Sequence, residues 1–407
     1  MSRYAAIAAT FLISLLLSAP RPAQAALIDV VWTGGVGAWG NAGAWSTGVV
    51  PDNGVDTYAV FIDGGADGIA SLVTVNGHFA IESLAIDSGD AVRIANTQAL
   101  TIAGGQIRND GDIVLSSGGA STRLLVEGDA SLAGDGRIES TIQTQNQVRG
   151  TGESPRLAVV AGATQTFVSS SALADGLLLI GGAAVGGGDP LAIANAGELV
   201  AAERGRPEFV DTIVANDGGT LRALADSSFS VGTGARIFGG TLASEGTGEI
   251  RGTGGTLDGV HNTGSVRVLN AQSLTLAGAV RNDGVIALST TGGFLTRLLV
   301  EGDASLAGDG RIESTNTAQN QVRGTGESPR LAVAAGATQT FASSSASADG
   351  LLLIGGAATA GGDPLAIANA GELVAAERGR PEFVDTVVMN DGGTLRALAD
   401  SSFSVGT

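Results

Sequence analysis

The chain has 407 residues, of which 43% are hydrophobic and 4% aromatic, with 64 glycines, 9 prolines and no cysteine. Its formal net charge is −18 at pH 7, and all 22 basic residues are arginine. Without cysteine the chain has no disulfides, thiolate nucleophiles or cysteine-bound metals. The two histidines, His78 and His261, lie far apart in sequence, which argues against a histidine-based metal site or catalytic triad. The acidity argues against nucleic acid or anionic membranes as partners.

The N-terminus has the parts of a secretory signal peptide. Arg3 precedes an apolar run from Ala5 to Leu17, and small residues stand at Ala23 and Ala25. This run is shorter than the ~20 residues that a membrane span needs, and no later segment reaches that length. We therefore predict that residues 1–25 are a signal peptide, with a retained membrane anchor as the alternative. The mature chain is expected to have no transmembrane segment and to be secreted or held at the cell surface.

Residues 26–80 hold all three tryptophans, Trp32, Trp39 and Trp45, in a chain that is otherwise poor in aromatic residues. Clustered aromatic rings could form a platform on which sugars stack. They could also cover the open end of a repeat structure, where no earlier repeat shields the core. Because a repeat structure needs such a cover and the chain has only one tryptophan cluster, we predict an N-terminal cap and the first coils here.

Residues 81–407 are built from short apolar runs, such as RLLVEG and LLLIGG, that end in Gly, Asn, Asp or Ser. Such runs predict short strands separated by tight turns. The tripeptide Asn-x-Gly recurs between them at a regular spacing, as from Asn262 to Asn282. Because Asn and Gly tolerate positive φ, we interpret these tripeptides as corners. The period predicts an all-β fold, an elongated parallel β-solenoid with about 20–21 residues per coil. The tripeptides begin at Asn109, Asn195, Asn216, Asn262, Asn282, Asn369 and Asn390.

A large block of the solenoid is present twice. Thr122–Thr233 matches Thr296–Thr407 without a gap, at a constant numbering offset of 174 and with ten substitutions. Weaker resemblance extends the block to about residues 93–233 and 267–407, which we expect to form about eight coils each. The first copy continues beyond SVGT, whereas the sequence stops there in the second. We therefore expect that a C-terminal part, with any anchor, follows, and that the open end could self-associate.

The N-terminal pattern W-x-G-G…W…W-S-x-G…P uses Trp32, Gly34, Gly35, Trp39, Trp45, Ser46, Gly48 and Pro51. Together with the segment GGTLDGVHNTGSVRVLNAQSLTLAGAVRNDGVIAL at 254–288, it resembles the secreted β-strand-repeat proteins of Gram-negative bacteria. Many proteins of this group carry a C-terminal PEP-CTERM sorting signal, and related solenoids are the passengers of autotransporters. The resemblance implies export and association with the cell surface or with exopolysaccharide. No PEP-CTERM signal is found before Thr407, which leaves the export route and the anchor open.

The best candidates for chemistry lie in the repeated stretch TRLLVEGDASLAGDGRIEST. By analogy with β-helix enzymes that cleave acidic polysaccharides, carboxylates and an arginine could act as acid, base or Ca2+ ligands. However, the aspartates stand next to glycine, which is typical of corners where Asp accepts hydrogen bonds from the backbone. We therefore predict structural carboxylates, with no catalytic, cofactor or metal site. The candidates are Glu127, Asp129, Asp135 and Arg137, and in the second copy Glu301, Asp303, Asp309 and Arg311.

Two arginine-bearing segments, RGTGESPR at 149–156 and ERGRPEF at 203–209, recur in the second copy. They are interpreted as solvated loops, or alternatively as a repeated contact surface. The resulting functional hypothesis is an exported structural or adhesive protein, a solenoid that acts as a spacer or as an extended binding face, possessing no catalytic activity. The alternatives are a polysaccharide lyase or glycosidase, and an autotransporter passenger adhesin.

Overall fold

The computed structural model describes residues 25–62, 70–141, 146–170, 176–290, 294–314, 320–344, 349–356 and 362–406. All of the predicted signal peptide except its last residue therefore lies outside the described residues. Within the described ranges, no helix is both long and apolar enough to cross a membrane. The regular structure in these ranges is β-strand, apart from one short 3-10 helix, η1 (Ala42–Ala44).

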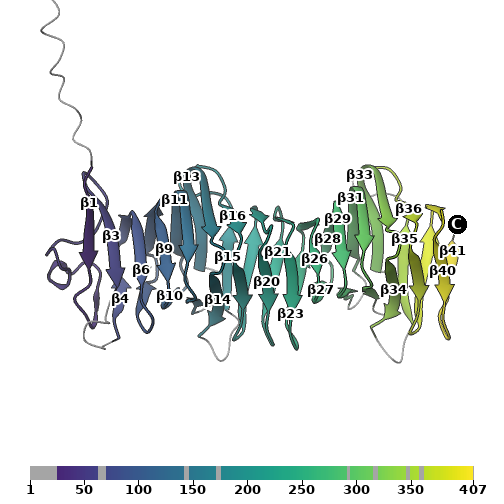
Figure 1. Ribbon diagram of the computed structural model, residues 1–407, viewed down its shortest axis with the longest axis horizontal. Helices are drawn as coiled ribbons and strands as arrows, with labels where there is room; N and C mark the ends of the chain where they lie inside the picture. Colours follow the sequence, from purple (N-terminus) through teal and green to yellow (C-terminus); the bar gives the residue numbers. More distant parts are fainter. Residues whose placement is uncertain are drawn as a thin grey trace, which may run out of the picture.

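The strands stack side by side into an elongated rod (Figure 1). Pairings between the named strands are parallel, and they form three separate ladders, which are the three faces of the rod. The chain passes from the first face to the second, then to the third, and then back to the first one strand further along the rod. This confirms the predicted fold class, a parallel β-solenoid.

The strands of each face are as follows. The first face contains β5 (His78–Ile81), β8 (Ala99–Ala103), the first halves of β11 (Thr122–Ala133) and β13 (Asn146–Val159), β15 (Gly176–Gly181), β18 (Gly205–Val210), β21 (Ser228–Gly232), β24 (Glu249–Thr253), β27 (Ser265–Val268), β30 (Val285–Leu288), β32 (Arg311–Ser314), β34 (Thr338–Ser343), β37 (Glu372–Ala375) and β40 (Thr394–Ala397). The second face contains β1 (Leu27–Val31), β3 (Thr57–Ile62), β6 (Ser83–Ile86), β9 (Gln106–Asn109), the second halves of β11 and β13, β16 (Ala192–Asn195), β19 (Ile213–Ala215), β22 (Arg236–Phe238), β25 (Thr256–Asp258), β28 (Ser273–Ala277), the first halves of β31 (Thr296–Ala307) and β33 (Asn320–Val333), β35 (Gly350–Gly355), β38 (Gly379–Val384) and β41 (Ser404–Gly406). The third face contains β2 (Val36–Ala38), β4 (Leu72–Val75), β7 (Ala91–Ile94), β10 (Asp112–Leu115), β12 (Arg137–Ser140), β14 (Thr164–Ser169), β17 (Glu198–Ala201), β20 (Thr220–Ala223), β23 (Thr241–Ser244), β26 (His261–Asn262), β29 (Ala279–Asn282), the second halves of β31 and β33, β36 (Ala366–Asn369) and β39 (Val387–Met389).

One apolar core runs along the inside of the rod. Alternate residues of each strand point inward, as in β16, whose burial alternates between half-buried and buried. The buried Val, Leu, Ile and Phe side chains form one continuous cluster from Val30 to Phe383. In-register pairing places similar side chains of successive coils beside each other, for example Leu221 beside Leu242, so each coil covers the core of the previous one.

The length of a coil varies along the rod. The expected period is found where Val266 pairs with Ile286. Among the paired strands named above, the advance along the chain is shortest where Ile250 pairs with Val266. It is longest, and equal, where Val36 pairs with Leu72, Leu157 with Ile193 and Leu331 with Ile367. Two of the long coils carry β13 and β33, and each of these strands turns a corner at residues of positive φ, Gly152 and Ser154 in β13 and Gly326 and Ser328 in β33. The sequence period did not reveal these enlarged coils.

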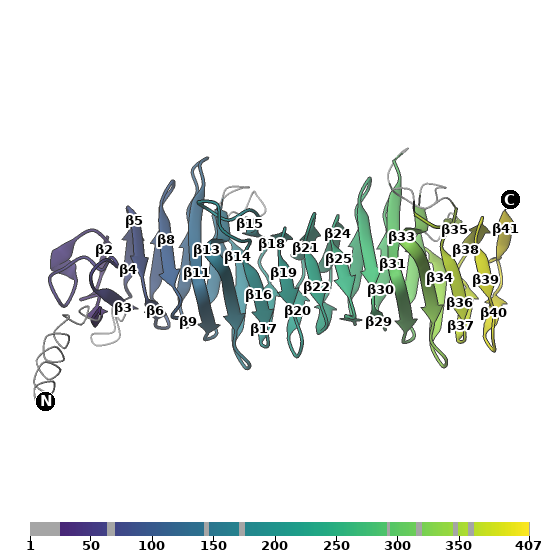
Figure 2. The same cartoon turned by 90° about the horizontal axis from the view of Figure 1, so that it is seen from above.

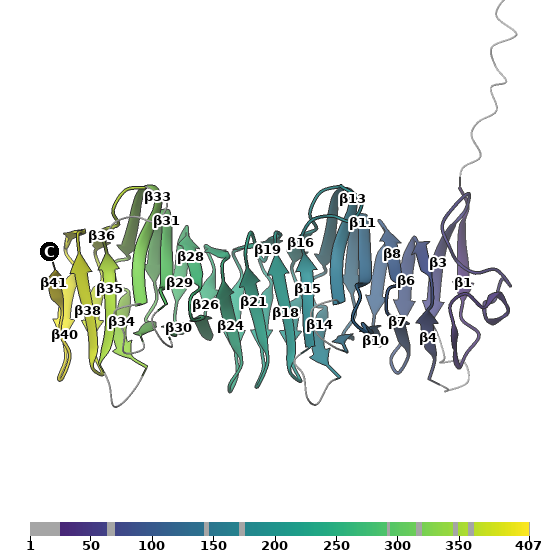
Figure 3. The same ribbon diagram turned by 180° about the vertical axis from the view of Figure 1, so that it is seen from behind.

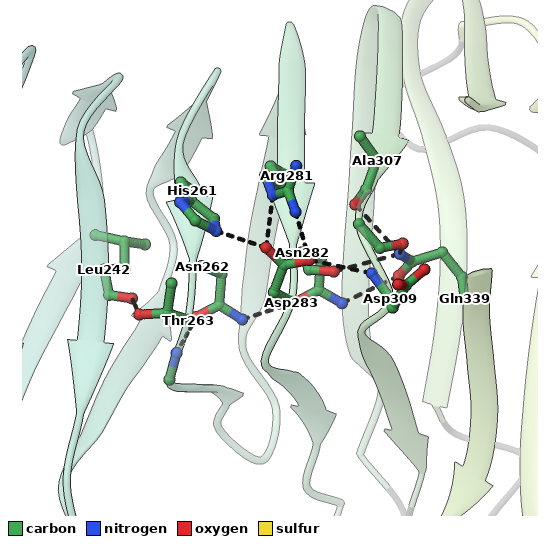
Figure 4. A network of polar contacts seen from close by, with 12 residues as sticks. Leu242, His261, Asn262, Thr263, Arg281, Asn282, Asp283, Ala307, Asp309 and Gln339 are labelled. Atoms are coloured by element: carbon green, nitrogen blue, oxygen red, sulfur yellow. Dashed lines mark hydrogen bonds and ion pairs between the residues drawn. The ribbon is translucent and has the colours of Figure 1, made fainter. Parts of the chain in front are cut away.

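The asparagines of the Asn-x-Gly tripeptides do not adopt the positive φ that the sequence led us to expect. Six of the seven are instead buried, with side chains that hydrogen-bond to a neighbouring coil. Asn262 Nδ2 donates to Asn282 Oδ1 at 2.8 Å (Figure 4), and Asn195 Nδ2 donates to Asn216 Oδ1 at 2.7 Å. Where the next coil has no asparagine, a glutamine from the coil after it reaches back: Asn282 Nδ2 donates to Gln339 Oε1 at 3.1 Å. These asparagines therefore form an inward-pointing polar ladder in which each buried amide makes at least one hydrogen bond, although Oδ1 of Asn109 and Oδ1 of Asn369 accept none.

The three tryptophans lie at the N-terminal end of the core and are almost completely buried. Trp45 packs edge-on against both Trp32 and Trp39, with ring centroids 4.9 Å apart in each case. Its indole Nε1 donates to the carbonyl oxygen of Trp39 at 2.8 Å. Because the rings are enclosed, a sugar could not stack on them, and their contacts are those of a cover over the first coils.

The two copies of the block do not begin on the same face. β11 starts on the first face and pairs there with β8, whereas its copy β31 starts on the second face and pairs with β28. The first-face pairing order β11–β13–β15–β18–β21–β24–β27–β30 takes seven steps, and the chain then passes one corner to reach β31. The offset is thus seven coils and one third of a coil, rather than about eight whole coils.

The rod twists along its axis, and the twist compensates for this offset. In the two perpendicular views, β11 and β13 rise above their neighbours on the same side as β31 and β33 (Figures 1 and 2). The view from behind shows the same alignment (Figure 3). A third of a turn spread over seven steps is ~17° per step, within the range of roughly 10–35° for neighbouring twisted strands. The duplicated surfaces therefore face the same direction.

Candidate functional site

The candidate residues of the repeated stretch are not gathered into one site. Asp129 is exposed on the second face, where its register partner is Arg156. Asp135 lies at the next corner, and its Oδ1 accepts a hydrogen bond from the backbone N–H of Thr164 at 2.9 Å. Arg137 follows on the third face. The second copy repeats this arrangement one face further on, and Oδ1 of Asp309 accepts from the N–H of Thr338 at 3.1 Å.

The two arginines of the stretch instead hold a distant turn. Arg137 Nη2 lies 3.1 Å from Glu203 Oε2. In the second copy, Arg311 binds Glu377 through two nitrogens, at 2.5 and 2.9 Å. The hydrogen bond from Arg311 holds the pKa of the Glu377 carboxyl below its usual value. Arg137 and Arg311 therefore position the segment ERGRPEF and its copy.

This turn has an unusual backbone. Glu203 and Arg204 have positive φ values of 48° and 65°, and Glu377 and Arg378 have 48° and 62°. A non-glycine residue in this region costs on the order of 1–3 kcal/mol, so the surrounding structure must hold it. The N–H of Gly176 donates to the Arg204 carbonyl at 3.2 Å in support. The turn therefore fixes the backbone position from which the side chains of Arg204 and Arg378 extend.

An arginine-lined cleft opens beside this turn in both copies, and we call the pair the arginine clefts. Their volumes are about 450 Å³ in the first copy and about 540 Å³ in the second. Both lie in the usual range for ligand sites, roughly 300–1,000 Å³. The first cleft is lined by Arg204, Arg206, Asp226, Ser227, Thr247 and Arg251. The second cleft is lined by Asp349, Arg378, Arg380, Asp400, Ser401 and Ser402.

Four residues of each cleft stand at equivalent positions of the two copies: Arg204, Arg206, Asp226 and Ser227 correspond to Arg378, Arg380, Asp400 and Ser401. The described lining of the first cleft has three arginines against one aspartate, whereas that of the second has two of each. Asp349 lies 3.4 Å from Arg378 Nε and 3.1 Å from Arg380 Nη2. Its counterpart in the first copy, Asp175, lies outside the described residues.

One further arginine in each copy lies on a strand that precedes the cleft: Arg149 in β13 and Arg323 in β33. Burial and the neighbouring Arg123 lower the pKa of Arg149, and burial and Arg297 lower the pKa of Arg323. Arg149 also donates from Nη1 to the carbonyl of Ala183 at 2.9 Å. Along the first face, β13 is followed by β15 and then by β18, which carries Arg206. Arg149 and Arg206 therefore share the first face but stand four register positions apart along the strands.

Sequence reasoning identified the segment 203–209 as a possible contact surface but missed the other walls of the cleft. Asp226, Ser227, Thr247 and Arg251 come from the next two coils, and only strand register brings them beside Arg204. Among the described residues, no group of three or more His, Asp or Glu could hold a metal ion. The cleft arginines with printed contacts have acidic partners: Arg251 Nε lies 2.6 Å from Glu249 Oε1, and Arg378 and Arg380 both lie close to Asp349.

No protein-family model matches the sequence, and no curated protein sequence matches it. Among solved structures, the chain is similar to a fragment of TibA that TibC has hyper-glycosylated. The alignment has 15% sequence identity and a TM-score of 0.21, and it covers 82% of this chain and 99% of the fragment. A TM-score this low establishes no common function, and the description of the rod rests on its own strand pairing.

Proposed function

We propose that the protein is an exported structural and adhesive rod that projects from the cell surface and binds extracellular material along one side. The observation that carries this proposal is the repetition of one block on a continuous solenoid, with the long strands β11 and β13 rising on the same side as β31 and β33 (Figures 1 and 2). A rod whose coils share one core keeps its surface groups at fixed spacing, which suits a spacer or an extended binding face. Export is supported by the signal-peptide pattern of residues 1–25.

A non-catalytic role is favoured by what the candidate catalytic residues do. Glycoside cleavage by two carboxyl groups needs them about 5–10 Å apart across a bond. Asp135 and Asp309 instead accept hydrogen bonds from the backbone of the following coil, and Arg137 and Arg311 bind the glutamates of the turn beside each cleft. These roles of Asp135, Asp309, Arg137 and Arg311 are structural.

The block duplication supplies a clean experiment. Deleting residues 122–295 joins Ser121 to Thr296 and leaves one complete copy with its native sequence on both sides of the junction. We expect the deleted protein to remain folded and to be shorter by seven strand spacings and one corner, about 35 Å at ~4.8 Å per spacing. Small-angle scattering measures the length, and a tagged, surface-displayed pair of proteins reports adhesion to a matrix-coated surface.

We expect weaker adhesion from the single-copy rod than from the native rod, and no release of oligosaccharides from a panel of uronic-acid polymers by either. Equal adhesion by the two rods would remove the support for a repeated binding face. Release of oligosaccharides, lost in an Asp135→Asn and Asp309→Asn variant that stays folded, would replace the structural proposal with an enzyme.

A further inference from the structure

We propose that Arg137 and the acidic residues around it form an acid-sensitive latch on the turn at Glu203. While Asp112 is ionised, Arg137 is shared between Asp112 and Glu203. When Asp112 takes up a proton, Arg137 turns to Glu139 and holds Glu203 through both terminal nitrogens of its guanidinium. The second copy of the block has a valine in place of the aspartate, so its turn keeps the second arrangement throughout. This inference does not depend on the proposed adhesive function.

The first copy shows the shared arrangement. Nε of Arg137 lies 3.6 Å from Oδ1 of Asp112, and its Nη2 lies 3.1 Å from Oε2 of Glu203. Glu139 follows Arg137 by two residues on the same strand, β12, and the contacts of the described residues include no ion pair between the two. The guanidinium therefore makes a single contact to the turn and directs its Nε at Asp112.

The second copy shows the other arrangement in the same local sequence. Nε of Arg311 donates to Oε1 of Glu313 at 3.2 Å. Its Nη1 and Nη2 donate to the two carboxylate oxygens of Glu377, at 2.9 and 2.5 Å. Such a paired contact between an arginine and a carboxylate is stronger and more directional than a single one. The arginine of the second copy therefore holds its turn more firmly than that of the first.

One difference in charge separates the surroundings of the two arginines. The register partner of Arg137 on β10 is Asp112, whereas that of Arg311 on β30 is Val285. The other differences are in size, because two valines beside the first-copy glutamate are replaced by alanines in the second copy. They are Val114 and Val168 in the first copy, and Ala287 and Ala342 in the second. Charge and size therefore make separate predictions, which substitution can distinguish.

The charge of Asp112 is the part of the latch that responds to acid. Burial raises the pKa of Asp112 above its usual value of 3.8; Arg137 opposes this shift, and the carboxylates of Glu139 and Glu203 add to it. Because the pKa is higher in the folded state, ionised Asp112 destabilises the latch above the raised pKa, and this effect disappears as pH falls toward 3.8. The glutamate of the second turn differs, since its hydrogen bond from Arg311 lowers its pKa.

The neighbouring elements place uncharged residues next to the latch in register. On β14 the register partner of Arg137 is Thr166, and on β7 that of Asp112 is Ala91. The charges that shift the pKa of Asp112 are accordingly those of the latch itself. The other charged groups of these elements and their corners are Arg93 on β7, Asp90 with the N–H of Ser71, Asp110 with Arg108, Asp135 with the N–H of Thr164, and Arg204 beside Glu203.

The latch acts on a turn whose opening can be measured. Glu203 and Arg204 have positive φ, so the turn depends on its surroundings to stay closed. The N–H of Arg204 donates to Oγ of Ser227 at 3.0 Å, and that of Gly205 donates to the carbonyl of Ala202 at 2.7 Å. Both amides exchange with solvent when the turn opens. Because Arg204 and Ser227 line the first cleft, acid should order this wall without changing the second cleft.

Hydrogen exchange of the full chain, read by mass spectrometry, tests the latch. The turn has the same sequence in both copies, but peptides that extend to position 213 or 387 contain Ile213 or Val387 and so differ in mass. Because the turn sequences are identical, their intrinsic exchange changes equally with pH. The ratio of the two exchange rates therefore reports the opening of the first turn relative to the second.

Four variants separate charge from size. Asp112→Asn removes the charge at constant shape, and Val285→Asp introduces it into the second copy. Arg137→Gln removes the latch. Val114→Ala combined with Val168→Ala gives the first copy the small neighbours of the second and is the control for size. Unchanged exchange in coils far from the latch shows that each variant is folded.

At pH 7, Asp112→Asn should slow exchange of the first-copy peptide by about threefold, the size expected of one additional exposed ion-pair contact, and leave the second-copy peptide unchanged. In the native protein, acidification through the midpoint of Asp112, measured by carbon-13 titration, should change the ratio of the two rates by the same factor. Val285→Asp should give the second copy this pH response, and Arg137→Gln should abolish it in the first. The size control should keep it.

The latch is refuted if Asp112→Asn leaves the first-copy peptide unchanged, or if the pH response of the ratio persists in that variant. It is also refuted if the valine-to-alanine control removes the response, because side-chain size rather than charge would then select the partner of Arg137. A second copy that stays insensitive to pH after Val285→Asp would equally contradict the assignment to the aspartate.

Discussion

Two Asn-Asp-Gly tripeptides of the chain require glycine for different physical reasons, and substitution can separate them. Gly218 has a φ of +79°, and nothing lies within 4 Å of where its Cβ would be. Gly284 is not among the residues of positive φ, but a Cβ there would lie 2.1 Å from the carbonyl oxygen of Gly264 in the preceding coil. Gly218 is thus a conformational requirement, whereas Gly284 is required because two coils approach closely.

The cost at Gly284 follows from the hydrogen bonds that a wider separation would break. Backbone N–H groups of Asp283, Gly284 and Val285 donate to Asn262 or Gly264 at 2.9, 3.1 and 2.9 Å. At about 1 kcal/mol each, losing the three bonds costs about 3 kcal/mol. Ala at position 218 should cost ~1–2 kcal/mol for its left-handed backbone, and Asn less, because its side chain tolerates that conformation.

Hydrogen exchange read peptide by peptide is the suitable assay, because a solenoid opens locally and has no single unfolding free energy. For Gly284→Ala, we expect exchange of β26, β29 and β30 to accelerate by about 10²-fold, since every 1.4 kcal/mol is tenfold. Asn should restore most of the protection at position 218 and none at position 284. If Gly284→Ala keeps native protection, or if Asn is equally harmful at both positions, close coil approach is not the reason for this glycine.

The remaining predictions concern the polar ladder, the cap and one carboxylate. Asn282→Leu should leave Gln339 Oε1 without its 3.1 Å donor and reduce local stability by about 2–3 kcal/mol, visible as faster exchange in β29 and β34; native exchange rates would refute the ladder. Trp45→Ala should cost about 3–5 kcal/mol at the N-terminal end and leave the central coils protected, and near-ultraviolet dichroism should lose its tryptophan signal. Asp283 has a pKa of about 2, chiefly because of its hydrogen bond from Arg281. Its folded-state pKa is depressed, so its stabilising contribution is present above about pH 4 and is lost as pH falls toward 2. Carbon-13 titration should show Arg281→Gln raising that pKa toward 3.8, and an unchanged midpoint would contradict the pairing.

The apolar runs predicted short strands, and the regular spacing of the Asn-x-Gly tripeptides between them predicted the parallel solenoid, because coils that stack in register repeat their corners at a constant interval. The role of the asparagines was not predictable in the same way. Asn and Gly are favoured both at positive-φ corners and in buried ladders, and the sequence does not distinguish a left-handed turn from a stacked side chain. Only the pairing of Asn262 with Asn282 across one coil shows that the side chain points inward.

The arginine clefts were even less accessible to sequence reasoning. Arg204 and Arg206 were visible as part of a repeated segment, but Arg251 lies in a different coil, two strands along the first face. Coil length varies, so the residue that lies beside Arg206 cannot be found by adding a fixed period. The same irregularity hid the enlarged coils around β13 and β33, where paired residues such as Leu157 and Ile193 are separated by much more than one regular coil.

The rotation of the second copy by one face indicates that the three faces are physically interchangeable. β13 lies on the first and second faces and β33 on the second and third, yet their residues follow the same order of burial. What a strand requires is an apolar inward side and a neighbouring coil in register, and every face provides both. At the junction between the copies, Glu301 in β31 binds Arg236 at 2.9 Å. The first copy lacks this contact, because Ile62 stands at the position equivalent to Arg236.

A duplication of any whole number of strands can therefore fold into the rod, but only a duplication whose offset matches the twist returns the copied surface to the same side. In this chain, the twist accumulated over seven steps matches the offset of one third of a coil. A repeated binding face requires this match, whereas the stacking of coils alone does not require it.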